Sequence, residues 1–169
     1  MGIAILGSSG MLGRALCHYF NSISQPYVGF NRIALDVCDP DSVQAVLDGV
    51  ESLKYVINCT GYTDVDGAES NESAAFELNG TAVGYLADYC AQRGVRLIHF
   101  STDYVFDGKK SSGYVETDRP APLNVYGWSK LKGEDLIQSR MSDYLIFRLQ
   151  WLYGEGGGHF IQRIMELAR

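Results

Sequence analysis

Short apolar runs alternate along the chain with longer segments in which apolar residues recur every three or four positions. Such runs are typical of strands buried on both faces, and the spaced segments are typical of amphipathic helices. Strands are predicted at residues 1–6, 25–30, 54–58, 96–101 and 144–149. Helices are predicted at residues 11–20, 40–50, 72–93, around 126–130 and 160–169, with loops at 64–69 and 107–124. This alternation predicts an α/β fold: a doubly wound parallel sheet of the Rossmann type, with helices on both faces.

The helix predicted at residues 72–93 ends at Gly94, which favours a left-handed helix terminus. Ala75, Leu78 and Leu86 belong to its apolar stripe, and Asn79 lies on the same side. Two interpretations of Asn79 stay open: a core amide that bonds backbone, or a support for an active site.

Composition and charge narrow the class of protein. The chain has 169 residues, 46% hydrophobic and 20% charged, which suits one globular domain. Its net charge of −6, without a basic run, argues against nucleic acid or an anionic membrane as a partner. No signal peptide and no apolar run long enough to span a bilayer is found, so a cytoplasmic location is expected.

The cysteine spacing predicts no metal site and no redox pair. Cys17, Cys38, Cys59 and Cys90 lie far apart in the sequence and are expected to be four buried free thiols. His99, between Ile98 and Phe100, is expected to be a hydrogen-bonded core histidine rather than a catalytic base.

A glycine motif follows the first predicted strand and opens the first predicted helix. It runs Gly7-Ser-Ser-Gly10-Met-Leu-Gly13. Glycine permits a sharp turn and a close approach of backbone to phosphate, and the helix N-terminus attracts the negative pyrophosphate. The motif therefore predicts a dinucleotide site, with a flexible Gly/Ser turn as the alternative.

The second strand indicates which dinucleotide is bound. In NAD-binding folds an acid about 20 residues after the glycines often binds the adenosine ribose. Here no Asp or Glu occurs before Asp36, and Asn31-Arg32 follow the strand instead. Arg32 favours the ribose phosphate of NADPH, with NADH as the alternative. A solvated loop charge at Arg32 and an ordinary loop acid at Asp36, beside Val37, stay open as alternatives to adenosine contacts.

Tyr126 and Lys130 carry the candidate chemistry. Four residues apart on a helix, they lie on one face, one turn from each other. A phenol has a pKa near 10, and a nearby ammonium lowers it; a shift of about three units needs roughly 4 kcal/mol. A hydroxyl from Thr102 or Ser101, at a strand end, is suited to hold a substrate carbonyl. The pattern predicts carbonyl reduction; the alternative is a surface helix pair.

Four candidate site segments follow strands directly. Gly7, Gly61, Thr102 and Trp151 all lie just beyond the carboxyl ends of predicted strands. In a parallel sheet these ends lie on one edge, where ligands bind. The four segments are therefore expected to converge on one rim of the sheet.

These motifs together resemble the extended short-chain dehydrogenase/reductase superfamily, and within it the dTDP-4-dehydrorhamnose reductase family. The resemblance rests on the glycine motif, Ser101-Thr-Asp-Tyr-Val-Phe-Asp-Gly108, Pro122-Leu-Asn-Val-Tyr-Gly-Trp-Ser-Lys130 with Gly133-Glu134, Asn58–Asp66 with Ala68-Glu69, and Trp151-Leu-Tyr-Gly154. It departs from the family at Thr60 and Gly61, where Ala is usual, and at Leu149-Gln150, where Thr-Ser is usual.

The resemblance implies reduction of the 4-keto group of a nucleotide-linked 6-deoxy sugar in dTDP-L-rhamnose synthesis, with Thr102, Tyr126 and Lys130 catalytic. It implies substrate contacts from Val65, Asp103, Tyr104 and Trp151, with a purely packing role as the alternative for Trp151. It implies cofactor contacts from Gly7, Ser9, Gly10, Met11, Leu12, Asn31, Arg32, Asp36, Val37, Cys59, Thr60, Gly61, Tyr62, Asn79, Ser101, Tyr126 and Lys130. Sister dehydratases have Asp-Glu after the catalytic Thr, whereas Tyr104 follows Asp103 here, which favours reduction.

Residues 1–169 are expected to form the NAD(P)-binding Rossmann domain with its catalytic helix, without the C-terminal lobe by which family members grip the nucleotide-sugar. Three alternatives stay open: a regulatory subunit like that of methionine adenosyltransferase, which shares this fold; a dinucleotide-binding or redox-sensing module with idle catalytic residues; and another nucleotide-sugar enzyme of the superfamily. Whether the protein forms a homodimer is also open.

Overall fold

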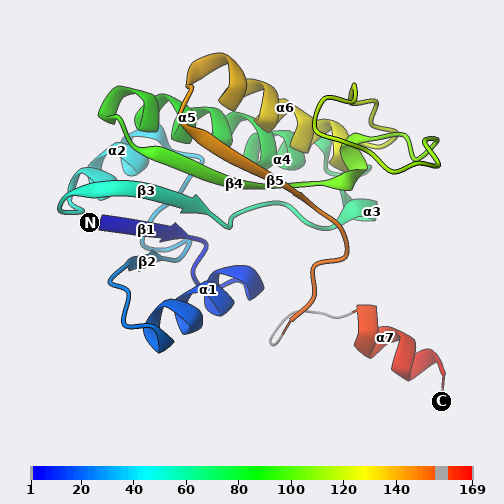
Figure 1. Ribbon diagram of the computed structural model, residues 1–169, viewed down its shortest axis with the longest axis horizontal. Helices are drawn as coiled ribbons and strands as arrows, with labels where there is room; N and C mark the ends of the chain where they lie inside the picture. Colours follow the sequence, from blue (N-terminus) through cyan, green and yellow to red (C-terminus); the bar gives the residue numbers. More distant parts are fainter. Residues whose placement is uncertain (1, 155–159, 169) are drawn as a thin grey trace.

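A five-stranded parallel sheet forms the centre of the protein in a computed structural model, which describes residues 2–154 and 160–168 (Figure 1). The strands are β1 (Gly2–Leu6), β2 (Val28–Phe30), β3 (Leu53–Asn58), β4 (Arg96–Thr102) and β5 (Tyr144–Leu149), in the spatial order β2-β1-β3-β4-β5. Every neighbouring pair is parallel. The order therefore reverses at β1, which makes the crevice beside its carboxyl end the expected ligand site.

Helices cover both faces of the sheet, which confirms the predicted doubly wound α/β fold (Figure 1). Helix α1 (Met11–Ser22) lies on one side, and α2 (Pro40–Asp48), α4 (Glu72–Phe76), α5 (Ala82–Arg93) and α6 (Val125–Arg140) lie on the other. Successive residues of β1 serve opposite faces: Ile3 and Ile5 pack on the α1 side, while Ala4 and Leu6 join the larger core. Burial on both faces explains why β1 is a continuous apolar run.

The second strand is shorter than predicted. It begins at Val28 rather than at residue 25. Ser24 has a φ of 55°, which places a left-handed turn there, and Pro26 has no N–H to donate to a neighbouring strand. These two residues delay the start of β2.

The segment predicted as one helix at residues 72–93 contains a π-helical turn. The turn η1 (Glu77–Thr81) joins α4 to α5, and Asn79 and Gly80 within it are buried. Helix α5 ends as predicted at Gly94, whose φ is 62°. Such turns are frequent at functional sites because they redirect side chains within a continuous helix.

Two short helices occur where loop was expected or no element was assigned. Helix α3 (Val65–Ala68) lies in the predicted loop at 64–69, and the Asp64 side chain accepts a hydrogen bond from the Gly67 N–H at its start. The 3-10 turn η2 (Asp103–Val105) follows β4 directly. The last described helix, α7 (Phe160–Leu167), agrees with the predicted one except at its C-terminal end.

Helix α6 begins where Asn124 caps it and packs closely on the π-helical turn. The Asn124 side chain accepts a hydrogen bond of 2.8 Å from the Gly127 N–H. Further along, a Cβ atom on Gly133 would lie 2.3 Å from the Asn79 carbonyl oxygen, so only glycine fits there. The backbone of α6 thus lies directly against η1.

The prediction of four buried thiols is wrong for three of them. Cys90 is buried, but Cys17, Cys38 and Cys59 are partly exposed. Burial raises the pKa of the Cys59 and Cys90 thiols to about 12, which keeps both protonated. No helix in the described ranges is long and apolar enough to cross a bilayer.

Replacing Gly133 by Ala is expected to destabilise the protein by about 2 kcal/mol, because the new methyl group forces α6 away from η1. Chemical denaturation measures the free energy of unfolding. Gln138→Ala, at an exposed position of the same helix, is the control and should change it by less than about 0.5 kcal/mol. Equal effects of the two changes would contradict the close contact.

Candidate active site

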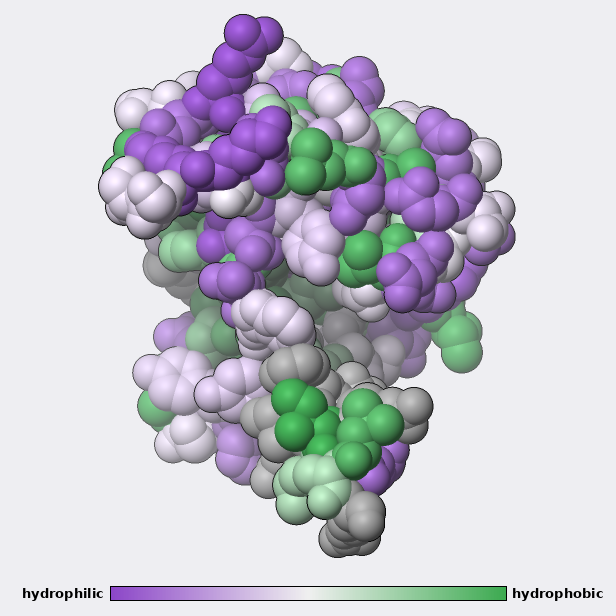
Figure 2. All heavy atoms as spheres, turned by 90° about the vertical axis from the view of Figure 1, so that its right-hand side faces the viewer, coloured by the Kyte–Doolittle hydropathy of each residue, from purple (hydrophilic) through white to green (hydrophobic). Residues whose placement is uncertain are grey.

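The candidate residues gather where the strands end, at the right-hand edge of the sheet in Figure 1. Figure 2 looks onto this edge and shows scattered hydrophobic side chains among polar ones, with an apolar group at the lower end, where α7 lies. Exposed large side chains of this region include Tyr104, Trp128 and Trp151. The edge therefore combines polar chemistry with accessible aromatic surface.

The glycine motif forms a tight turn between β1 and α1. Gly7 has a φ of 73°, and a Cβ atom on it would lie 3.0 Å from the Cys59 carbonyl. A Cβ atom on Gly13 would lie 2.2 Å from the Gly7 carbonyl oxygen, so α1 can approach the loop only at a glycine. No side chain caps α1, so its first N–H groups are available to an anion. These features fit the pyrophosphate of a dinucleotide.

The loop after β3 connects the glycine motif to α6. Cys59 donates its N–H to the Leu6 carbonyl at 3.0 Å, which joins the ends of β1 and β3. A Cβ atom on Gly61 would lie 3.8 Å from the Lys130 ammonium nitrogen and 3.3 Å from the Asn79 amide oxygen. The space above Gly61 thus opens directly toward Lys130.

Asn79 links this loop to helix α6. Its amide oxygen accepts from the Tyr62 N–H at 2.9 Å, and its amide nitrogen donates to the Tyr62 carbonyl at 3.0 Å. The same nitrogen donates to Ser129 Oγ at 3.0 Å, and Ser129 in turn donates to the Tyr126 carbonyl. Asn79 is therefore a core amide that bonds backbone, and it also links this loop to α6.

The end of β4 meets the start of α6. Thr102 Oγ1 donates to Asp103 at 3.2 Å and accepts from the Tyr104 N–H at 3.2 Å. The Tyr104 and Tyr126 rings meet edge to face, with centroids 5.7 Å apart. A Cβ atom on Gly127 would lie 2.3 Å from the Tyr104 carbonyl oxygen. The structure thus brings Thr102 and Tyr126 together.

The expectation of a lowered Tyr126 pKa is wrong for the protein alone. Burial raises the pKa of Tyr126 above 10; a hydrogen bond with Thr102 opposes this rise, and the charges of Asp103 and Tyr104 add to it. The Lys130 ammonium does not offset the desolvation, because it is directed at the β4 backbone. The phenol therefore holds its proton at neutral pH.

Lys130 is a buried cation, only 5% exposed. Its ammonium group donates to the Phe100 carbonyl oxygen at 2.6 Å. Burial lowers the pKa of Lys130 to about 8, and the negative charge of Glu134 opposes that shift. The surface helix pair considered as an alternative is thereby excluded.

His99 is a core residue, as predicted, but only one of its ring nitrogens is bonded among the described residues. Nδ1 lies 3.2 Å from the Asn58 amide nitrogen, while Nε2 is buried without a hydrogen-bond partner. Burial holds the pKa of His99 well below 6.5, and the nearby Lys130 charge lowers it further. His99 is therefore neutral and unsuited to act as a base.

The predicted adenosine-side residues lie after β2. The Asn31 side chain accepts from the N–H groups of Ile33 and Ala34, so it shapes the turn. Arg32 and Asp36 are exposed, whereas the Val37 side chain is buried in the core. Arg32 is thus accessible to a ligand, and Val37 can offer a ligand only its backbone.

The predicted substrate-side residues are less closely linked to one another. Tyr104 contacts Tyr126, as described, and Val65 opens α3, which packs on α6. Trp151 is 58% exposed and has a φ of 52°, in the left-handed region. A Cβ atom on Gly154 would lie 3.7 Å from Met11, so the segment after β5 returns to the glycine motif.

Three supporting residues were missed as site residues from the motifs alone. Ser129 links Asn79 to Tyr126, and Glu134 binds both Ser101 and Arg148. The available signal was the recurrence of polar residues at positions 126, 130 and 134, which lie on one helix face. Arg148 had no such signal, because it lies in an otherwise apolar strand.

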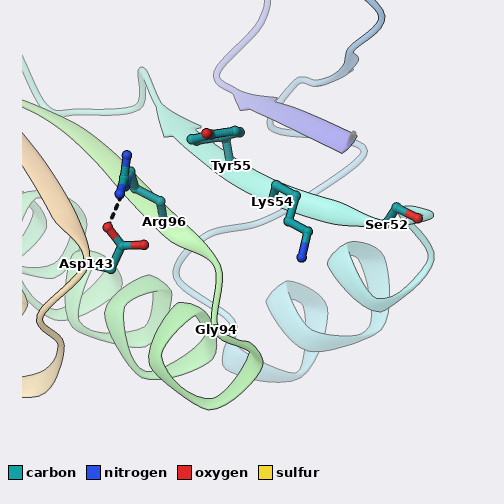
Figure 3. Close-up of a pocket in the computed structure, with 6 residues that line it drawn as sticks. All are labelled: Ser52, Lys54, Tyr55, Gly94, Arg96 and Asp143. Carbon is teal, nitrogen blue, oxygen red and sulfur yellow. Dashed lines mark hydrogen bonds and ion pairs between the residues drawn. The ribbon is translucent and has the colours of Figure 1, made fainter.

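A groove of about 460 Å³ lies at the opposite edge of the sheet, where strands begin (Figure 3). It is lined by Ser52, Lys54, Tyr55, Gly94, Arg96 and Asp143, and Figure 3 shows Arg96 turned toward Asp143. Its ion pair is solvent-exposed, and no candidate catalytic residue lines it. The groove is therefore not the site of the chemistry.

Within the part of the chain that the structure describes, no group of three or more His, Cys, Asp or Glu is arranged to hold a metal ion.

Comparison with known proteins shows which family the chain belongs to. A family model described as the RmlD substrate binding domain matches residues 1–169. The chain is 38% identical over 169 residues to a dTDP-4-dehydrorhamnose reductase of Burkholderia thailandensis, covering 100% of this chain and 56% of the relative. It is 39% identical over 166 residues to a dTDP-4-keto-6-deoxy-D-glucose reductase of Streptomyces niveus, covering 98% and 57%.

A solved structure agrees with these relatives. The dTDP-4-dehydrorhamnose reductase of Bacillus anthracis in complex with NADP is 34% identical, with a TM-score of 0.93. The match covers 98% of this chain and 59% of that one. This chain thus spans little more than half the length of the relatives it matches.

Lys130→Met is expected to give a stability difference from the wild type that depends on pH. Because the folded pKa of about 8 lies below the unfolded value of 10.5, the unfolded chain binds more protons between these values. Raising the pH from 8 to 10.5 should therefore stabilise the wild type relative to the variant by about 3 kcal/mol. Denaturation curves across this range measure it. Gln138→Ala is the control, and a pH-independent difference for Lys130→Met would contradict the buried ammonium.

Proposed function

We propose, since this chain belongs to the RmlD substrate binding domain family, that it supplies the cofactor site and the proton donor of an NADPH-dependent reductase. The reaction is reduction of the 4-keto group of a nucleotide-linked 6-deoxy sugar, as in dTDP-L-rhamnose synthesis. The observation that carries the proposal is that Thr102 and Tyr126 lie together on the sheet edge that holds the glycine motif, with buried Lys130, one helical turn along from Tyr126, next to Gly61. The activities of the relatives and the NADP in the Bacillus anthracis structure support it.

The cofactor site of this proposal is built on the glycine motif. Gly7, Gly10 and the start of α1 would hold the pyrophosphate, because added side chains would fill the space or clash with backbone. The exposed Arg32 would bind the ribose phosphate of NADPH, with NADH as the alternative. The remaining cofactor contacts proposed are Ser9, Met11, Leu12, Asn31, Asp36, Val37, Cys59, Thr60, Tyr62, Asn79 and Ser101. When bound, the dinucleotide supplies the hydride that reduces the carbonyl.

Tyr126 would donate the proton in this reduction. Burial keeps its pKa above 10, so the phenol is protonated and ready to donate as negative charge develops on the substrate oxygen. The positive charge of Lys130, one helical turn from Tyr126, would favour the phenolate left behind. The Thr102 hydroxyl, now bonded to Asp103, would turn to donate to the same oxygen and orient it.

The proposed substrate contacts surround this group. Tyr104 and Trp151 offer exposed aromatic surface on which a sugar ring can pack, and Val65 and Asp103 complete the set. Tyr104 stands where dehydratases of the superfamily have a glutamate base. The tyrosine at this position in place of the glutamate base supports reduction rather than elimination.

Residues 1–169 account for the cofactor side and the proton donor, and we assign them to one NAD(P)-binding unit. The chain covers only 57% and 56% of the length of the two relatives described above. Activity is therefore tested on the natural full-length protein.

Tyr126→Phe is expected to reduce turnover of dTDP-4-keto sugars at least 100-fold, because the proton donor is lost while the ring packing on Tyr104 is kept. NADPH oxidation measures turnover, and fluorescence titration measures cofactor affinity, which should change less than about threefold. Tyr85→Phe, on α5, is the matched control. A wild type that binds NADPH but reduces no such sugar would support the cofactor-sensing alternative, and co-purification with a methionine adenosyltransferase would support the regulatory one.

Arg32→Ala is expected to weaken NADPH binding about tenfold or more, since a charged hydrogen bond to phosphate is lost. NADH binding should change less than about twofold, because NADH has no such phosphate. Titration of both cofactors against both proteins measures the ratio, with Arg119→Ala, another exposed loop arginine remote from β2, as the control. Equal losses for the two cofactors would contradict the assignment of Arg32.

A further inference from the structure

We propose that Glu134 is a positioning residue for the reduction: its buried carboxylate fixes the strand end carrying Thr102 against the helix carrying Tyr126 and Lys130. This inference rests on the proposed function and adds a residue outside the reacting group.

Glu134 is a carboxylate in the protein interior with both oxygens bonded. It is only 1% exposed. Oε1 accepts from Ser101 Oγ at 2.5 Å and from Arg148 Nε at 3.0 Å, and Oε2 accepts from Arg148 Nη2 at 2.6 Å. A carboxylate with three such donors is held in one orientation.

The two partners of Glu134 come from neighbouring strands. Ser101 and Arg148 are register partners in the β4–β5 ladder, so one helix residue clamps a directly paired position of the sheet. Ser101 precedes Thr102 in the chain. A shift of α6 along the sheet would therefore break several hydrogen bonds at once. Thr102 is the last residue of the same strand, so these bonds also fix its position relative to α6.

Lys130 makes the adjacent attachment. It donates to the carbonyl of Phe100, the residue before Ser101. Tyr126, Lys130 and Glu134 are spaced four apart and lie on one helix face. Helix α6 is thus tied to two consecutive residues of β4, immediately before the candidate carbonyl-binding hydroxyl.

Through Arg148, the contacts of Glu134 also extend to the segment that follows Thr102. The Arg148 guanidinium lies over the Phe106 ring, 4.9 Å from its centroid, and Phe106 stacks on Tyr114 at 4.1 Å. Arg148 therefore contacts both the buried carboxylate and Phe106, which in turn stacks on Tyr114 in the loop at residues 107–124. Removing Glu134 would leave Arg148 with this aromatic contact but without its counter-charge.

The positioning of α6 against the sheet, rather than a gain in stability, accounts for a buried charge at Glu134. A buried ion pair costs desolvation free energy that its attraction only partly repays, and apolar replacements are often as stable. Glu134 also acts on Lys130, since its negative charge favours the ammonium form. The groups that face Lys130 are Glu134 on α6 and the neutral His99 on β4, and the groups that face Glu134 are Lys130 and Arg148 on β5.

Glu134→Gln in the natural full-length protein tests the inference, because glutamine keeps the shape and an acceptor for Ser101 but loses the charge. We expect kcat to fall at least tenfold while KM for NADPH stays within twofold. The alkaline limb of the kcat profile should move to lower pH, since Lys130 loses its proton more readily without the negative charge of Glu134. If Glu134 acted only on stability, kcat would not fall separately from KM, and the alkaline limb would not move.

The double variant Glu134→Gln with Arg148→Met separates position from stability, because it removes both charges together. We expect its Tm to return toward the wild-type value while kcat and the alkaline limb stay shifted. Asp88→Asn is the matched control: it breaks the exposed 2.5 Å pair with Arg140, also on α6, and should leave turnover unchanged.

Three outcomes would overturn the inference. Wild-type kcat and pH profile in Glu134→Gln would show that the charge does not act on the reaction. Recovery of kcat together with Tm in the double variant would show a structural role only. A wild type without turnover on any nucleotide-linked 4-keto sugar would overturn the proposed function as well, whereas the first two outcomes leave that function intact.

Discussion

The burial of a charged lysine is the constraint around which this edge of the protein is built. An ammonium group inside a protein needs acceptors, a counter-charge and space, and each is supplied by a different element. The Phe100 carbonyl is the acceptor, Glu134 provides the negative charge, and Gly61 leaves room beside the nitrogen. The positions of β3, β4 and α6 relative to one another follow from these requirements.

Small residues and polar side chains together hold α6 close to its neighbours. Gly127 and Gly133 let the backbone of α6 touch that of its neighbours, and Asn79 and Ser129 then supply directional bonds at this distance. Close approach without these bonds would leave the helix free to slide, and bonds without the glycines could not form. The site is therefore specified by packing and hydrogen bonding together.

Much of this arrangement was predictable from the sequence, for identifiable reasons. Parallel strands buried on both faces leave a strong apolar signal in the sequence. The glycine motif and the Tyr126–Lys130 spacing predict two parts of one candidate site. The π-helical turn was missed because the apolar stripe continues across it from Ala75 to Leu86. The raised pKa of Tyr126 was missed because desolvation depends on tertiary burial, which spacing along one helix does not report. Arg148 was missed because its carboxylate partner lies 14 residues away, on another element.

The π-helical turn at Glu77–Thr81 has a consequence for how this helix tolerates length changes in evolution. Each residue advances an α-helix by about 100°, so a turn that holds an extra residue absorbs a rotation that would otherwise be passed along the helix. Deleting one residue there would restore an unbroken α-helical ladder but swing the Asn79 amide away from Tyr62. Homologous sequences should therefore resist gaps between Phe76 and Ala82, although an uninterrupted helix would have better backbone geometry on its own.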